Sequence, residues 1–306
     1  MENKTLSFYG RGKLLLTGEY AILNGARALA LPCQKGQKLT FKALSNNELL
    51  WESFDVHENS WFKARFQLPS FTIINSSKAS IALSLQFILK RAQELNPDFL
   101  RQQGGHVKTS LEFERQWGLG SSSTLVSSIA KWAGVNAYDL LEHSFGGSGY
   151  DLACAVSENP ICYTRNGFHP IIEKVFFSPI FSKHLYFVYL NQKQSSLDAI
   201  KGIKPTAFNR EIIQEIDVIT DYILRCTVQE SFNTLLEKHE EIIATVLQKI
   251  PVKERLFSDF DGAIKSLGAW GGDFIIASGD HNSPRYFEEK GFKTVIPYTD
   301  IIYAQK

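Results

Sequence analysis

One segment of this 306-residue chain combines residue types that bind phosphate. It reads Gly118-Leu119-Gly120-Ser121-Ser122-Ser123-Thr124, and it joins a predicted strand to a predicted helix with apolar periodicity. Glycines let the backbone approach an anion closely, and the N–H groups and dipole of a first helical turn favour phosphate. Hydroxyls add hydrogen bonds or ligate a hard cation such as Mg²⁺. The segment predicts a phosphate-binding loop, and a simple Ser N-cap after a turn is the alternative.

A second candidate is the carboxylate of Asp151, which follows Gly149 and Tyr150 and precedes an apolar run. A carboxylate within hydrogen-bond reach of an acceptor hydroxyl can take its proton during phosphoryl transfer. The simpler interpretation is an N-cap on a helix that begins near Leu152. Both interpretations stay open on the residues alone.

Four other residues have competing interpretations. Lys13, before a leucine run, is either a catalytic cation or a gatekeeper at a strand edge. Glu19 is either a turn residue or an outer-shell ligand, and Glu142 is either a cation ligand or a solvated helix residue. Trp270 is interpreted as a packing residue rather than a platform for adenine.

Composition argues for a packed globular protein and against nucleic acid or a membrane surface as the main partner. Lys plus Arg number 33 against 32 Asp plus Glu, a net charge of +1, which gives no footprint for nucleic acid or an anionic membrane. No apolar run approaches the ~18–20 residues of a membrane span, and the first residues lack the pattern of a signal peptide. A cytoplasmic protein is therefore expected. The four cysteines and seven histidines show no spacing typical of a zinc site, and the sequence leaves the oligomeric state open.

The pattern of apolar residues predicts an α+β protein of two domains. Period-two alternation predicts strands at 38–43, 61–68 and 107–113, and helical spacing predicts a helix at 77–95. Glycine and prolines break the pattern at 167–179, so we expect domains at 1–175 and 176–306. In the second domain we expect helices at 208–225 and 232–249, and strands at 184–190, 273–278 and 293–303.

Three separated segments together resemble the GHMP kinases, the superfamily of galactokinase, homoserine kinase, mevalonate kinase and phosphomevalonate kinase. Residues 12–25 read G-K-L-L-L-T-G-E-Y-A-I-L-N-G and resemble the opening motif of the family. Residues 118–124 resemble its G-L-G-S-S-A loop, and 265–272 resemble its C-terminal glycine-rich motif, although Trp270 and Asp273 replace small residues. The G-S-G-Y-D-L-A segment at 147–153 resembles the S-G-x-D of the mevalonate kinase branch, and more closely a bacterial subgroup named for a G-Y-D-I-A motif.

This resemblance implies a fold and a set of cofactors. The implied fold is α+β, with an N-terminal domain like the second domain of ribosomal protein S5 and a ferredoxin-like C-terminal domain. The implied cofactors are ATP and Mg²⁺. The nucleotide would contact the loop at 118–124 and the third motif through Gly268 and Gly271.

The resemblance also implies the chemical roles of individual residues. Asp151 corresponds to the general base, and Lys13 to the lysine that contacts this base and the reacting groups. Ser122 corresponds to the serine that ligates Mg²⁺, and Glu142 is the best match to the acidic ligand upstream of S-G-x-D. The expected acceptor is a small metabolite, first of all mevalonate or phosphomevalonate of isoprenoid biosynthesis. The alternatives are an ATP-dependent decarboxylase of the same fold and a non-catalytic sensor.

Overall fold

The computed structural model describes residues 5–101, 103–142, 147–167, 169–192, 206–270 and 272–303. The chain forms two compact units, each built from several stretches of sequence. The first unit comprises Met1–Gly12, Lys35–Arg115 and Gly120–Val156, and the second comprises Lys13–Gln34, Gln116–Leu119 and Ser157–Lys306. The simpler division into 1–175 and 176–306 stays a prediction.

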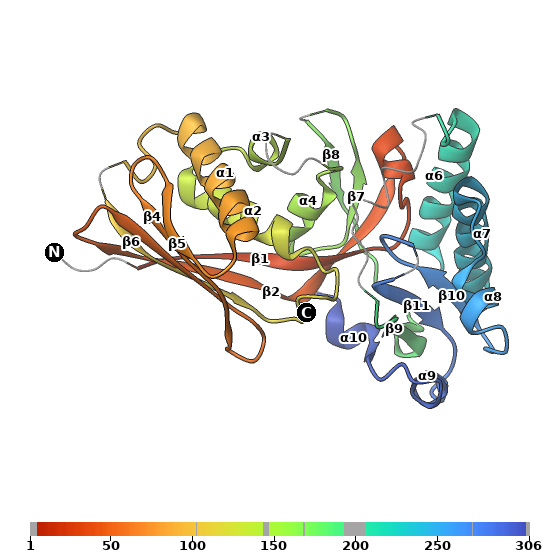
Figure 1. Cartoon of the computed structure of the whole chain (residues 1–306). Helices are drawn as coiled ribbons and strands as arrows, with labels where there is room; N and C mark the ends of the chain where they lie inside the picture. Colours follow the sequence, from red (N-terminus) through yellow and green to blue (C-terminus); the bar gives the residue numbers. More distant parts are fainter. Residues whose placement is uncertain are drawn as a thin grey trace. The chain divides into compact units, whose positions relative to one another are not determined.

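A twisted sheet with helices on one face makes up the first unit (Figure 1). The strands follow the order β5-β4-β3-β6-β2, in which β3 and β6 are parallel and the other pairs are antiparallel; β1 also pairs with β2. The helices are α1 to α4. The bounds are β1 Thr5–Leu15, β2 Ala28–Leu44, β3 Glu48–Phe54, β4 Ser60–Gln67, β5 Thr72–Ser76, α1 Ala79–Leu95, β6 Gly104–Leu111, α2 Ser121–Ala133, α3 Ala137–Glu142 and α4 Tyr150–Val156.

Alternation along the strands decides which face of this sheet is covered. In β4, Phe62 and Phe66 are buried, while Lys63 and Arg65 between them are exposed. Because successive side chains of a strand point to opposite faces, one apolar face meets the helices. The helix α1 contributes Leu85 and other apolar residues at helical spacing to the same core.

The second unit contains a separate antiparallel sheet with the order β10-β11-β9-β12. Its helix α7 packs on β10 and on α6. The strand β7 pairs with the first residues of β2, and β8 pairs with β7. The bounds are η1 Ala21–Asn24, β7 Ile161–Thr164, β8 Ile171–Lys174, η2 Ser182–His184, β9 Leu185–Tyr189, α6 Arg210–Arg225, α7 Gln229–Leu247, α8 Val252–Leu256, β10 Ala263–Ser266, β11 Phe274–Ser278, α9 Ser283–Glu289, β12 Val295–Pro297 and α10 Tyr298–Ile301.

The α+β class predicted from the sequence is confirmed, and two of the predicted segments differ from the structure. The strand expected at 293–303 is only the three residues of β12, and α10 follows it. Proline lacks the N–H that a strand needs and fits a helix start, so Pro297 ends the strand. The break expected at 167–179 contains β8, which pairs with β7. None of the helices in the described ranges is long and apolar enough to cross a membrane.

Candidate active site

The glycine-rich segment opens directly onto the helix α2, as its sequence predicts. Gly120 is the N-cap residue, with φ 86° in the left-handed region, and no side chain caps the helix. The Ser N-cap alternative is therefore wrong. Among the residues that the structure describes, the hydroxyls of Ser121 and Ser122 have no hydrogen-bond partner, and Ser122 is exposed. The first-turn N–H groups and these hydroxyls are thus open to an anion.

Asp151 lies beside this helix start, in the first unit. The helix α4 begins at Tyr150, so Asp151 lies within its first turn and the N-cap alternative is wrong. The Ser123 hydroxyl donates a hydrogen bond to Asp151 Oδ2 at 3.2 Å. Two segments that the sequence singled out separately, 118–124 and 147–153, therefore meet through one hydrogen bond.

Thr124 fixes the start of α2 to the sheet. It is buried, and its Oγ1 lies 2.8 Å from Gln37 Oε1 and 2.9 Å from the Ser121 carbonyl oxygen. Gly10 of β1 runs so close that a Cβ there would lie 3.1 Å from Thr124. Of the four consecutive hydroxyl residues, the buried one anchors the helix, and the more exposed ones face outward.

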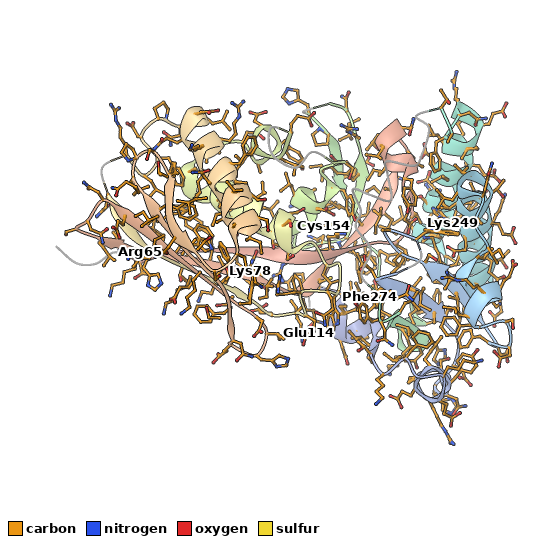
Figure 2. The ribbon with its side chains drawn as sticks, in the orientation of Figure 1. Arg65, Lys78, Glu114, Cys154, Lys249 and Phe274 are labelled. Carbon is orange, nitrogen blue, oxygen red and sulfur yellow. The ribbon has the colours of Figure 1, made fainter. Side chains whose placement is uncertain are left out.

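The segment 116–119 is held within the second unit. Trp117 packs edge-on against Phe274 of β11, with ring centroids 5.6 Å apart, and Tyr189 donates to the Gln116 carbonyl oxygen at 3.2 Å. Figure 2 labels Phe274. The Lys13 N–H donates to the Leu119 carbonyl oxygen at 3.1 Å. Lys13 itself is buried, which rules out an exposed strand-edge gatekeeper.

The third motif also reaches this segment. Gly118 has φ 66°, and a Cβ built on it would lie 2.5 Å from Asp273 Oδ2. The Asp273 carboxylate therefore packs directly on the first glycine of the loop. Gly268 also has φ 66° but has open space where a Cβ would be, while Gly271 lies outside the described residues.

A buried ion pair joins the opening motif to the third motif in the second unit. Lys265 Nζ lies 2.5 Å from Glu19 Oε1, and both side chains are almost fully buried. Lys265 Nζ also donates to the Ser266 carbonyl oxygen at 2.9 Å. Glu19 is thus not an exposed turn residue, and its role as an outer-shell ligand stays a prediction. The spacing of Glu19 alone could not reveal a partner so distant in sequence.

The helix α7 adds a second carboxylate and a histidine to this ion pair. Glu240 accepts hydrogen bonds from the Ser266 N–H at 2.9 Å and the Ser266 hydroxyl at 2.8 Å. His239 Nε2 accepts from the Gly18 N–H at 2.9 Å, which fixes the neutral tautomer with its proton on Nδ1. We call Glu19, His239, Glu240 and Lys265 the buried charge cluster.

Burial controls the protonation of this cluster. Desolvation raises the pKa of Glu19 to about 7 against the opposing effect of Lys265, and it also raises the pKa of Glu240. Desolvation, followed by the charge of Lys265, lowers the pKa of His239 well below its ordinary value. Because His239 is neutral, ionising both Glu19 and Glu240 would place two negative charges beside the single positive charge of Lys265. One proton on either carboxylate leaves the cluster neutral.

The hydroxyl oxygen of Ser122 and the carboxylate oxygens of Asp151 are of the kind that ligates Mg²⁺. This ion takes oxygen ligands, keeps several waters, and is often held by one or two carboxylates together with substrate phosphates. A hydroxyl and a carboxylate at the same helix start match that pattern. In the described part of the chain, no group of three or more His, Cys, Asp or Glu side chains is placed to hold a metal ion. Glu142, the last residue of α3, is exposed, and its role as a ligand stays a prediction.

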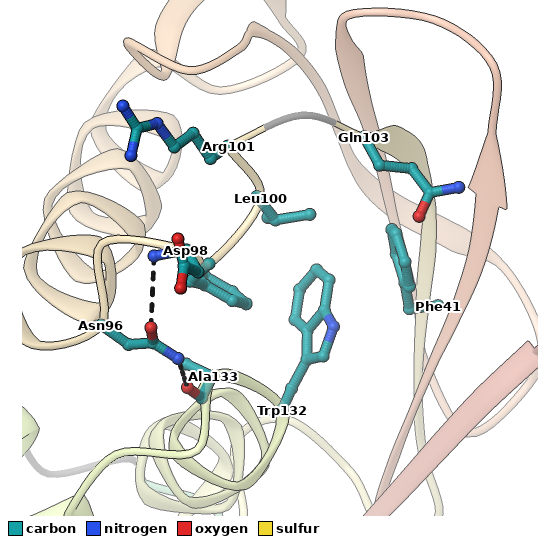
Figure 3. Close-up of a pocket in the computed structure, with 9 residues that line it drawn as sticks. Phe41, Asn96, Asp98, Leu100, Arg101, Gln103, Trp132 and Ala133 are labelled. Carbon is teal, nitrogen blue, oxygen red and sulfur yellow. Dashed lines mark hydrogen bonds between the residues drawn. The ribbon is translucent and has the colours of Figure 1, made fainter.

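The opposite end of α2 forms a different pocket (Figure 3). Trp132 lines this pocket, and its ring centroid lies 4.6 Å from that of Phe41 and 4.8 Å from that of Phe99. A thirteen-residue helix is about 20 Å long, so this aromatic pocket lies far from the loop. It is not part of the candidate active site.

Solved structures identify the fold. The chain is similar to the phosphomevalonate kinase of Streptococcus pneumoniae in complex with phosphomevalonate and AMPPNP (17% identity, 98% of each chain, TM-score 0.67). It is also similar to the mevalonate kinase of Methanococcus jannaschii (17%, 96% of each chain, TM-score 0.65) and to the galactokinase of Lactococcus lactis complexed with galactose (11%, 94% of this chain and 88% of that one, TM-score 0.66). No protein-family model matches the chain, and no curated protein matches it in sequence.

These similarities confirm the fold that the motifs imply. The chain has the fold of the GHMP kinases over nearly its whole length. At identities of 11–17% the likeness establishes the fold. The roles of the site residues remain proposals.

The contact of Gly118 with Asp273 gives a first prediction. Gly118→Ala should lower the melting temperature more than Gly134→Ala. Both glycines have φ 66°, so both variants carry the left-handed strain, about 1–2 kcal/mol. Only at Gly118 does the new methyl meet a neighbour, because Gly134 has nothing within 4 Å. Thermal unfolding of the two variants measures the difference, and equal losses would show that the Asp273 contact is absent.

The buried charge cluster gives a second prediction. A glutamate whose pKa rises from 4.5 to about 7 on folding stabilises the protein below pH 4.5, and this stabilisation is lost as pH rises through about 7. The free energy of unfolding should therefore fall between about pH 4.5 and 7, by up to about 1.4 kcal/mol per pH unit for one proton. Urea unfolding at several pH values measures this slope.

Two variants of α7 test the origin of that slope. Glu240→Gln removes one buried negative charge, so Glu19 can ionise beside Lys265 at lower pH and the slope should flatten. Glu237→Gln is the matched control, since Glu237 forms a surface ion pair with Lys253. If Glu240→Gln kept the wild-type slope, the charge of Glu240 would not be the cause of the raised pKa of Glu19.

Proposed function

We propose that this protein, whose fold is that of the GHMP kinases, is a small-molecule kinase that uses ATP and Mg²⁺. The observation that carries the proposal is the hydrogen bond from Ser123 to Asp151 at 3.2 Å. It brings a carboxylate to the helix start whose N–H groups can bind phosphate. A phosphate site and a nearby proton acceptor are the two components that phosphoryl transfer to a hydroxyl requires.

Each residue of the site has a role in the proposed transfer. The first-turn N–H groups of α2 would hold the phosphates of ATP, and Ser122 and Glu142 would ligate Mg²⁺. Bound Mg²⁺ supplies charge neutralisation on the transferred group. Asp151 would orient the acceptor hydroxyl and accept its proton. Lys13 would add positive charge near the transferred phosphoryl group and keep Asp151 ionised.

The proposed acceptor is mevalonate or phosphomevalonate. The support is the S-G-x-D-like segment that contains Asp151, together with two structural neighbours named as mevalonate and phosphomevalonate kinases. A galactokinase is equally similar in fold, so the acceptor must be tested directly. An ADP-release screen should include mevalonate, phosphomevalonate, homoserine and sugars. Release of carbon dioxide with ATP use would instead indicate a decarboxylase, and ATP binding without turnover on any acceptor would indicate a sensor.

The nucleotide site gives a third prediction. Mg²⁺–ATP should raise the melting temperature of the wild type, and Gly120→Val should abolish that rise, because the side chain crowds the phosphates. Gly134→Val is the matched control, since it introduces valine at the left-handed cap residue at the other end of the same helix. This control should keep the nucleotide-dependent rise. An unchanged rise in Gly120→Val would place ATP elsewhere.

The catalytic carboxylate gives a fourth prediction. Asp151→Asn keeps a hydrogen-bond acceptor for Ser123 but cannot take a proton, so kcat should fall about 10²–10⁴-fold. The dissociation constant for ATP and the melting temperature should change little. Asp139→Asn is the control, because Asp139 occupies the first turn of α3 as Asp151 does in α4. Near-normal turnover in Asp151→Asn would remove Asp151 from the mechanism.

A further inference from the structure

The second unit contains a cavity that the proposed reaction does not use. Its volume is about 460 Å³, within the range that small-molecule ligands occupy. It lies where the link after α7, the helix α8, the end of β10 and the loop of the third motif meet. Its lining includes Gln192, Lys249, Val252, Arg255, Ser266 and Trp270.

Two cationic side chains, those of Lys249 and Arg255, line this cavity. Lys249, labelled in Figure 2, lies just beyond the C-terminal end of α7, and Arg255 lies on α8. Neither side chain forms an ion pair with any residue in the described ranges. Lys253 on the same short helix differs, because it pairs with Glu237 at 2.8 Å. Among the described residues that line the cavity, two are cationic and none is acidic, which favours an anionic ligand.

Trp270 adds an unsatisfied donor to the cavity wall. Its side chain is only 4% exposed, and its indole N–H has no hydrogen-bond partner among the described residues. Its backbone N–H is used, donating to the Tyr20 hydroxyl at 3.0 Å. A buried donor without a partner is costly, and a bound acceptor oxygen would remove that cost.

We propose that this cavity binds the phosphate monoester of a small metabolite. A guanidinium matches phosphate with two parallel hydrogen bonds, and a lysine adds a second positive charge. Arg255 and Lys249 hold the phosphate, and the Trp270 indole N–H donates to an oxygen of the ligand. Val252 and the indole ring contact its organic part, which a volume of about 460 Å³ accommodates together with the phosphate.

The site is connected to the motifs of the candidate active site by hydrogen bonds. Trp270 is bonded to Tyr20 of the opening motif, and Ser266 is bonded to Glu240 of the buried charge cluster. A ligand in the cavity therefore contacts Trp270, which is bonded to the opening motif, and Ser266, which is bonded to α7. This binding does not depend on the proposed transfer reaction.

The indole N–H signals in a ¹⁵N–¹H spectrum of the full chain test the proposal. The chain has five tryptophans, and Trp270→Phe identifies the signal of Trp270 by its loss. Titration with glycerol 3-phosphate should move that signal, and sodium chloride at matched ionic strength should not. Inorganic phosphate should bind more weakly, because it lacks the organic part.

Variants locate the bound phosphate. Arg255→Gln and Lys249→Gln should each raise the dissociation constant of glycerol 3-phosphate at least about tenfold, from the loss of a charged hydrogen-bond donor. Lys253→Gln, on the same helix, should leave it unchanged. Gly120→Val should also leave it unchanged, which separates this cavity from the loop at 118–124.

Three results would each overturn the proposal. The first is a Trp270 signal that does not move, or that moves equally with sodium chloride. The second is wild-type affinity in both Arg255→Gln and Lys249→Gln. The third is equal affinity for inorganic phosphate and glycerol 3-phosphate, which would exclude an organic part in the cavity.

Discussion

The buried ion pair between Glu19 and Lys265 is the interaction on which the second unit depends. Removing one partner would leave an uncompensated charge away from water, which typically costs about 3–5 kcal/mol. The pair therefore commits the turn after β1 and the strand β10 to one mutual arrangement. That arrangement also brings Tyr20 to the Trp270 N–H and His239 to the Gly18 N–H. Two glycine-containing motifs from opposite ends of the chain are thereby held in a single unit.

The start of α2 meets two opposing requirements at once. A helix end that binds phosphate must leave its first N–H groups without protein partners, yet it must not move when the ligand binds. Thr124 supplies the rigidity, because it is buried against Gln37 and Gly10. Ser121 and Ser122 leave the anion-facing side open. The same four-residue run therefore contains both the anchor and the proposed binding surface.

Much of the fold and part of the site could be predicted from the sequence. Period-two alternation identified β4 and helical spacing identified α1, because each element buries one face and the pattern repeats locally. The sequence analysis extended the last strand to 303 and missed its end at Pro297, although a proline is itself a sequence signal that a strand ends. The N-cap interpretations of Asp151 and of the serines failed for a different reason. Their side chains bond to another helix or remain open, and local propensity carries no information on either outcome.

The sequence by itself determined the α+β class, the order of the motifs and the glycine loop at a helix start. These features depend on residue types within a few positions of one another. Only the tertiary structure decided that Glu19 and Lys265, 246 residues apart, form a buried pair, and that Arg255, Lys249 and Trp270 line one cavity. Coulombic pairing and desolvation depend on distance in space and on exclusion of water. In an extended chain these residues are far apart and in water, so they acquire these interactions only after the chain has folded.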